Sequence, residues 1–115
     1  MASAKNSQEK LDRDALEKVA ETFKVFSEGT RLAILQELKA GPMSVNQLVE
    51  AVESSQANVS KQLRTLYDAG IVSKQKSGTQ VFYSVSEEMV YPLCELVCGK
   101  LNRDRAGRHV VHYQI

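Results

Sequence analysis

Apolar residues recur at helical spacing through the first quarter of the chain, with Glu, Lys and Asp on the opposite face. A repeat of three to four residues is typical of an amphipathic helix, so the pattern predicts a helix over about 8–27. Such a stripe usually packs in a core or a dimer seam and rarely lines a ligand site. The residues of this stripe are Leu11, Ala15, Val19, Phe23 and Phe26.

Two shorter helices follow, and each comes after a residue that can cap a helix. Gly29 interrupts the first stripe, and Thr30 can cap a helix over 31–40, which Gly41–Pro42 then ends. Ser44 can cap a short third helix. The apolar residues that these two helices should bury are Leu32, Ile34, Leu35, Leu38, Val45, Leu48, Val49 and Val52.

A fourth helix is predicted over 56–69, after a tight polar break at Glu53–Ser55. Ser55 is a favourable N-cap, and Gly70 can adopt the left-handed conformation that ends a helix. The residues on the buried side of this helix are Val59, Leu63 and Leu66.

After Gly70 the spacing of the apolar residues changes from the helical repeat of three to four residues to the alternation of a β-strand. Segments 71–76 and 81–85 are short and rich in β-branched and aromatic residues, and Ser77–Gln80 between them is typical of a hairpin turn. A last helix is predicted to open at Ser86–Glu88, where acidic residues favour a helix N-terminus, and Pro92 predicts a kink or a restart within it. Its apolar side comprises Met89, Val90, Leu93, Leu96, Val97 and Leu101.

This order of elements predicts a mainly α protein with a small β-hairpin, a winged helix-turn-helix (ααααββα). We expect a flexible N-terminal arm over 1–10, one folded domain over 11–101 and a polar C-terminal tail over 102–115. The first and last helices carry more apolar surface than one small domain needs, so we predict a homodimer that pairs them.

Length and composition fit one globular domain, with 115 residues, 43% of them hydrophobic and 25% charged. No segment approaches the roughly 18 apolar residues of a membrane span, and the first residues lack the apolar core of a signal peptide. We therefore expect a cytoplasmic protein with no membrane partner. Its two cysteines cannot form a disulfide framework, so both are expected to be reduced thiols.

The excess of positive charge lies in the middle of the chain. Four basic residues stand against one acid over 54–85, a net charge of +3 within an overall charge of +1. The exposed face of the predicted fourth helix carries amides, hydroxyls and basic groups, and no acid before Asp68. Because amides can read adenine and Arg or Lys suits guanine or phosphate, this face favours DNA binding over an ordinary solvated surface.

Several motifs resemble the ArsR/SmtB family of bacterial repressors, in the same order along the chain. Phe26–Leu35 is similar to the family's "sDptRlrIL" segment, and Ser54–Leu63 resembles its recognition helix, "lSQstvSkHL". Further similarities to the "L…aGLV" and wing-strand "vyY" segments lie at Leu66, Ala69–Val72 and Val81–Tyr83. The resemblance implies a homodimer, paired through its first and last helices, that binds a double-stranded DNA operator as a repressor.

By this resemblance, four residues of the fourth helix face the bases: Gln56, Ala57, Ser60 and Lys61. Ala57 departs from the family's usual Ser and would lose a hydrogen bond to DNA. With the neighbouring polar residues and the hairpin included, the expected DNA-binding set is Ser44, Gln56, Ala57, Asn58, Ser60, Lys61, Gln62, Arg64, Lys74, Lys76 and Thr79.

Many family members release DNA when they bind a metal, but this chain departs from the family's usual sites. The site at the start of the third helix would fall on Ser44, Asn46 and Gln47, and the zinc site of the last helix on Glu87, Met89, Lys100 and Arg103. The cysteine pair of persulfide-sensing members is incomplete, since residues 30–40 contain no cysteine. We therefore expect no metal at these positions and no resident cofactor.

Cys94 and Cys98 lie one turn apart on the predicted last helix. Their Cβ atoms should be about 5–6 Å apart, wider than the roughly 3.5–4.5 Å of a disulfide. A thiophilic ion or a trivalent arsenical could bridge them more easily, and some arsenic-sensing members of the family carry cysteines in this helix. Three interpretations stay open: packing in the dimer seam, a thiol sensor for a thiophilic ligand, and a redox switch.

His109 and His112 invite comparison with a two-cysteine, two-histidine zinc site, Cys94-x3-Cys98-x10-His109-x2-His112. The histidine spacing is too short for a zinc finger, and the cysteines fall in a helix. Solvated tail histidines are the default interpretation, and structural zinc is the weaker alternative.

An enzyme is not expected, because the sequence contains no recognisable nucleophile–base pair and no phosphate-binding loop. The main alternative to a DNA-binding repressor is a winged helix that binds another protein. A family member with no inducer site is a further alternative. The acid-free face of the fourth helix counts against the protein-binding module.

Overall fold

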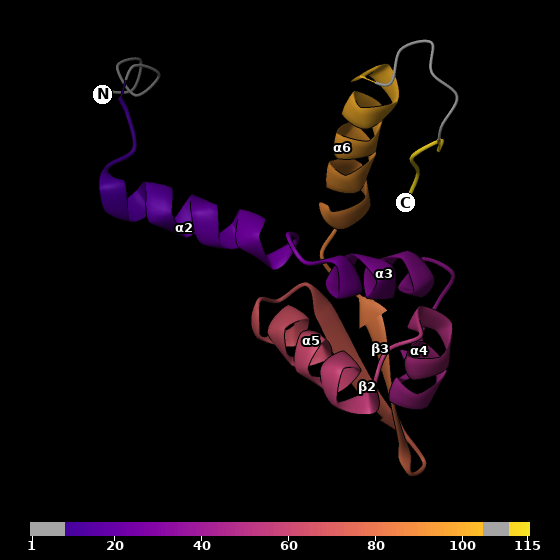
Figure 1. The fold of residues 1–115 in the computed structure, drawn as a ribbon. Coiled ribbons are helices and arrows are strands. Elements are labelled where there is room, and N and C mark those ends of the chain that lie inside the picture. Colours follow the sequence, from indigo (N-terminus) through magenta and orange to yellow (C-terminus); the bar gives the residue numbers. More distant parts are fainter. Residues whose placement is uncertain (1–8, 105–110) are drawn as a thin grey trace.

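The computed structural model describes residues 9–104 and 111–115. Its helices and strands follow the order of a winged helix-turn-helix, which confirms the predicted fold class (Figure 1). The expected arm over 1–10 falls mostly outside the described residues. The elements are α2 (Arg13–Val25), α3 (Gly29–Leu38), β1 (Met43–Ser44), α4 (Val45–Val52), α5 (Gln56–Asp68), β2 (Val72–Ser77), β3 (Gln80–Val85) and α6 (Val90–Asp104).

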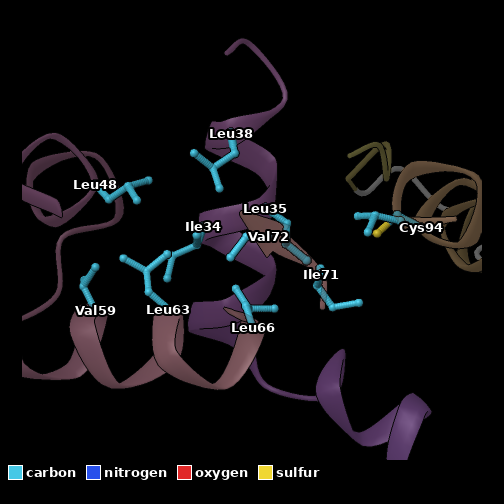
Figure 2. Close-up of a cluster of buried hydrophobic side chains, with 11 residues drawn as sticks. Ile34, Leu35, Leu38, Leu48, Val59, Leu63, Leu66, Ile71, Val72 and Cys94 are labelled. Carbon is cyan, nitrogen blue, oxygen red and sulfur yellow. The ribbon is translucent and has the colours of Figure 1, made fainter. Parts of the chain in front are cut away.

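The hydrophobic core lies between α3, α4, α5 and the sheet (Figure 2). Helical spacing places the apolar residues of each helix on one face, and these faces meet. Leu66, near the end of α5, has no exposed surface, and neither has Leu48 of α4. The fully buried side chains are Ile34, Leu35, Leu48, Leu63, Leu66, Val59 and Val90.

The wing is part of a three-stranded antiparallel sheet of order β1-β3-β2. The hairpin β2–β3 was predicted, whereas the two-residue strand β1 was not. In β1, Met43 lies opposite Tyr83, and Ser44 lies opposite Phe82. A two-residue strand has no detectable period, so it can be recognised only from its partner strand. This strand joins the wing directly to the start of α4.

Two of the three predicted helix caps are confirmed. Ser44 forms a capping box, with its Oγ accepting from the Gln47 amide at 3.2 Å and the Gln47 side chain accepting from the Ser44 amide at 2.9 Å. Ser55 Oγ accepts from the Asn58 amide at 3.1 Å. Gly70 ends α5 with φ of 77°, in the left-handed region as expected.

The predicted cap at Thr30 is wrong, because α3 begins at Gly29, two residues before the predicted start at 31. The cap is Glu28, whose carboxylate accepts from the Arg31 amide at 2.8 Å. Asp, Asn, Ser and Thr are the commonest caps, so a glutamate in this role carries a weak sequence signal.

The predicted start of the last helix at Ser86 is also wrong. The Ser86 amide donates to the Ile71 carbonyl at 3.0 Å, which ties this segment to the start of the wing, and α6 begins at Val90. Pro92 therefore falls in the first turn of α6. A first-turn residue needs no intrahelical partner for its amide, so the proline is tolerated there without the expected break.

Helices α2 and α6 stand out from the core and carry exposed apolar side chains (Figure 1). Phe23 of α2 is 62% exposed, and Leu96 of α6 is 72% exposed. The other large apolar residues exposed on these two helices are Leu16, Val19, Val97 and Leu101. Among residues 9–104 and 111–115, no helix has the length and apolarity needed to cross a lipid bilayer.

The chain end returns to the domain, although the tail was expected to be simply polar. Helix α6 continues past the predicted boundary at 101. The Asn102 side chain accepts from the Tyr113 amide at 2.8 Å and donates to the Tyr113 carbonyl at 3.0 Å. Ile115 packs against the core, and its carbonyl accepts from Lys39 Nζ at 2.9 Å.

Candidate nucleic-acid interface

Helix α5 presents a polar face to solvent while its opposite face is anchored in the core. Val59, Leu63 and Leu66 are buried on the inner side. The first turn contains no acidic residue, so the positive end of the helix dipole is not neutralised by a side chain. The predicted DNA-binding residues that are exposed on this helix are Gln56, Ala57, Ser60, Lys61 and Arg64.

Gln62 does not belong to this exposed face, although it was included in the predicted DNA-binding set. Its side chain is only 6% exposed. Its Oε1 accepts from Arg31 Nη1 at 2.6 Å, and its Nε2 donates to Asn58 Oδ1 at 3.0 Å. Asn58 is half-buried and donates in turn to Ser54 Oγ at 2.9 Å. Both amides therefore hold α5 in place, and Gln62 is not available to contact DNA.

Ser44 is a second predicted contact that the structure gives another role. The residue is 7% exposed, and its hydroxyl is occupied by the capping box of α4. Its polar residue type suggested a DNA contact, but the same hydroxyl satisfies a helix cap. We therefore omit Ser44 and Gln62 from the proposed contacts.

A polar hollow of about 290 Å³ lies where the starts of α4 and α5 meet the wing. Three predicted DNA contacts line it: Gln56 from α5, Thr79 from the wing turn, and Ser44, whose hydroxyl is already occupied by the capping box of α4. Asn46 and Gln80 line it as well, although neither belongs to the predicted DNA-binding set. The sequence could have indicated both residues, since Asn46 lies two positions after the cap of α4 and Gln80 is the last residue of the predicted turn.

The basic residues near α5 differ in how they are held. Arg64 Nε lies 3.1 Å from Asp68 Oδ2 in a solvent-exposed pair, which contributes little to stability. Lys74 Nζ lies over the Tyr67 ring. Lys61 and Lys76 are exposed, and neither takes part in an ion pair or a ring contact within the described residues.

The two cysteines lie on the buried side of α6. Cys94 is 5% exposed and belongs to the core cluster, at the edge shown in Figure 2, and Cys98 is 8% exposed. Burial raises the pKa of the Cys94 thiol, the nearby Cys98 raises it further, and Lys39 opposes the shift. A neutral, buried thiol is a weak nucleophile. This environment favours packing over a redox switch.

An apolar groove of about 190 Å³ exposes one side of Cys94. Residues from α2, α3, α6 and the chain end line it: Phe23, Phe26, Leu32, Leu93, Cys94, Val97 and Ile115. His112 is exposed, whereas His109 of the proposed zinc set lies outside the described residues. In the part of the chain that the structure describes, no group of three His, Cys, Asp or Glu side chains is arranged to hold a metal.

Comparison with known proteins places this geometry among bacterial regulators. A family model described as "Bacterial regulatory protein, arsR family" matches residues 28–74. The HTH-type transcriptional regulator NmtR of Mycobacterium tuberculosis is 36% identical over 85 residues, which cover 74% of this chain and 71% of NmtR. The arsenical resistance operon repressor of Bacillus subtilis is 34% identical over 88 residues, covering 74% of this chain and 84% of the repressor.

Solved structures agree with these similarities. The homodimeric winged helix-turn-helix DNA-binding domain of Mb0332 from Mycobacterium bovis has a TM-score of 0.72 and 30% identity, covering 90% of this chain and 97% of that domain. The transcriptional repressor BigR of Xylella fastidiosa has a TM-score of 0.66 and 29% identity, covering 78% of this chain and 96% of that chain.

Proposed function

Because this chain belongs to the ArsR family of bacterial regulatory proteins, we propose that it binds a pseudo-palindromic DNA operator as a homodimer and represses transcription. Its relatives are transcriptional regulators, so the chain is a regulator and not an enzyme. The observation that carries the proposal is the exposed, acid-free first half of α5 beside the polar hollow of the wing.

The roles of the contacting residues follow from their positions. Gln56, Ser60 and Lys61 lie in the first half of α5, the part of a recognition helix that reaches base edges in the major groove. Thr79 and Lys76 lie at the wing, where they meet the neighbouring phosphates. The phosphate contacts supply affinity and its salt dependence, whereas the base contacts supply the sequence preference.

Dimerisation through α2 and α6 accounts for the apolar surface that one chain leaves in water. Helix α2 buries none of its residues in the single chain. An apolar groove of about 240 Å³ separates the two helices, lined by Val19, Thr22, Phe23, Phe26, Met89 and Leu93. A two-fold partner that packs its own α2 and α6 here would remove this surface from water. The Mb0332 domain is described as homodimeric.

A thiophilic inducer is a second proposal, supported by the placement of the cysteines. Cys94 and Cys98 face the same buried side of α6, and Cys94 lines the groove that Phe23 and Phe26 also line. Phenylarsine oxide could form two As–S bonds with these thiols, with the two thiol protons and the arsenic-bound oxygen leaving as water, and its phenyl group would then lie beside the groove that Cys94 lines. We expect phenylarsine oxide to release DNA from the wild type and not from a Cys94→Ser/Cys98→Ser variant. Equal retention by both proteins would remove this second proposal.

The experiment for the main proposal is selection of bound duplexes from random-sequence DNA, followed by affinity measurements on the recovered operator. We expect a two-fold symmetric sequence with half-sites about one helical turn apart. Lys61→Ala should weaken binding, and Gln56→Ala should relax preference at one position per half-site by about 1–3 kcal/mol. Lys18→Ala, an exposed lysine on α2, is the matched control and should bind as the wild type does.

Failure of the wild type to enrich any duplex would reject the proposal in favour of a protein-binding winged helix. An operator that Lys61→Ala and Gln56→Ala bind normally would instead reject the assignment of α5 as the recognition helix.

A further inference from the structure

One arginine connects the end of α2 to the middle of α5. Arg31 Nε donates to the Val25 carbonyl at 2.7 Å, and Nη2 donates to the Lys24 carbonyl at 3.1 Å. Its Nη1 donates to Gln62 Oε1 at 2.6 Å. The two carbonyls belong to the last turn of α2, where the helix dipole favours a cation. The Lys24 carbonyl also accepts from the Ser27 amide at 3.0 Å and from Ser27 Oγ at 2.8 Å. A side chain of α3 thus holds two other helices at once.

The guanidinium also determines how the amides beyond it are oriented. An arginine can only donate hydrogen bonds, so the oxygen of Gln62 must face it. The Gln62 nitrogen is then left to donate to Asn58 Oδ1, and the Asn58 nitrogen to donate to Ser54 Oγ. Because Ser54 directly precedes the cap of α5, the network reaches from the end of α2 to the start of the recognition helix.

Helix α2 has few other attachments to its own domain. It buries no residue along its length, and it projects away from α3 (Figure 1). Only its last residue, Val25, and the following Phe26 pack against the core. The direction in which α2 leaves the domain therefore depends on a short apolar contact, on the turn at Ser27 and on the two hydrogen bonds that Arg31 donates to the last turn of α2.

We propose that Arg31 is a positioning residue that couples the direction of α2 to the orientation of α5, and so sets the half-site spacing that the dimer accepts. The inference rests on the proposed function, in which α2 forms part of the dimer interface. A 13-residue helix is about 20 Å long, so a modest tilt at its end moves the two recognition helices by several ångströms. Such a shift disturbs the simultaneous fit of two half-sites and leaves the fit of one unchanged.

The test compares Arg31→Met with a matched control, Arg13→Met, which removes an exposed arginine of α2 that pairs with Glu17. The probes are the symmetric duplex selected with wild type, versions with one or two base pairs added or removed between half-sites, and a duplex with a single half-site. Arg31→Met should bind the selected duplex at least tenfold more weakly than wild type does, while its affinity for the single half-site should stay within threefold of wild type. Its affinity should also vary less than that of wild type among duplexes with different half-site spacing. Arg13→Met should match the wild type throughout.

A second variant, Gln62→Met, removes the link to α5 while Arg31 keeps both carbonyls of α2. Gln62→Met should show the same loss of preference for one half-site spacing. It replaces Arg31→Met in the test if Arg31→Met does not fold. Equal losses on single and paired half-sites, or no loss on either, would overturn the inference while operator binding by wild type stands. Failure of wild type to bind any duplex would overturn the proposed function together with this inference.

Discussion

The ammonium group of Lys74 lies 4.4 Å from the centre of the Tyr67 ring, in a cation–π contact between β2 and the second half of α5. Lys76 is two residues further along the same strand, so its side chain leaves from the same face of β2, nearer the wing turn. Lys74 is thus held toward the end of α5 that lies away from the polar hollow, whereas Lys76 is free to approach a phosphate.

The two lysines should therefore behave differently when each is replaced by alanine. Lys76→Ala should weaken binding to all duplexes similarly and reduce the slope of affinity against salt by about 1. Lys74→Ala should leave that slope nearly unchanged and lower the free energy of unfolding by about 0.5–1 kcal/mol, the contribution of an exposed cation–π contact. Salt titrations of operator binding and urea unfolding separate the two effects. A larger loss of affinity for Lys74→Ala would reverse these assignments.

The Cys94 thiol should react slowly while the protein is folded. Burial raises its pKa above the ordinary value of 9.0, so the thiolate is scarce near neutral pH. We expect iodoacetamide to modify Cys94 at least tenfold more slowly in the native protein than in urea at pH 7.5. Peptide mapping of the modified residue measures this rate. Equally fast modification in both states would show that the thiol is accessible.

The same shift links stability to alkaline pH. A raised pKa in the folded state means that stability is fully present below pH 9 and falls as the pH rises toward the folded-state value. Cys94→Ala should therefore lose less stability than wild type between pH 8 and pH 10. Urea unfolding across this range tests the difference, with Cys98→Ala as the matched substitution one turn away. Parallel curves for wild type and Cys94→Ala would contradict it.

Ser44→Ala should destabilise the protein without changing the sequence that it prefers. The substitution removes the side-chain acceptor of the α4 capping box, which costs about 0.5–2 kcal/mol. Thermal unfolding and operator selection measure the two properties separately. Ser73→Ala, at an exposed position in β2 where the hydroxyl lies 3.4 Å from that of Ser84, should leave the operator preference unchanged and cost less stability than Ser44→Ala. A shifted operator preference for Ser44→Ala would return this residue to the DNA-contacting set.

Asn102→Ala should detach the chain end from α6. The substitution removes both hydrogen bonds to the Tyr113 backbone. Their loss should destabilise the docked chain end by about 1 kcal/mol. Hydrogen exchange at the Tyr113 amide should become faster, and Arg103→Ala next to it serves as the control. Unchanged exchange at this amide would show that Ile115 and Lys39 hold the segment without Asn102.

Local signals in the sequence were sufficient for the order of the helices and the wing hairpin and for the helix ends at Ser44, Ser55 and Gly70, whereas the first helix, predicted over 8–27, spans Arg13–Val25. The caps at Ser44 and Ser55 and the stop at Gly70 depend on residues within a few positions of one another, so a single sequence shows them. The period of the apolar residues separates helices from the wing strands for the same reason. The surplus apolar surface of the first and last helices predicted a dimer, and the family resemblance added the expectation of a repressor.

Tertiary structure decided the features that depend on residues far apart in the chain. Arg31 and Gln62 are 31 positions apart. The polar residue type at 62 predicts an exposed contact, but in the fold the guanidinium of Arg31 occupies the side-chain oxygen of Gln62. Strand β1 exists because Met43 and Ser44 meet β3, and α6 starts late because Ser86 bonds to Ile71. A residue's type determines which bonds it can form, but packing determines which partner it finds, and therefore whether its side chain reads DNA or holds the helix that does.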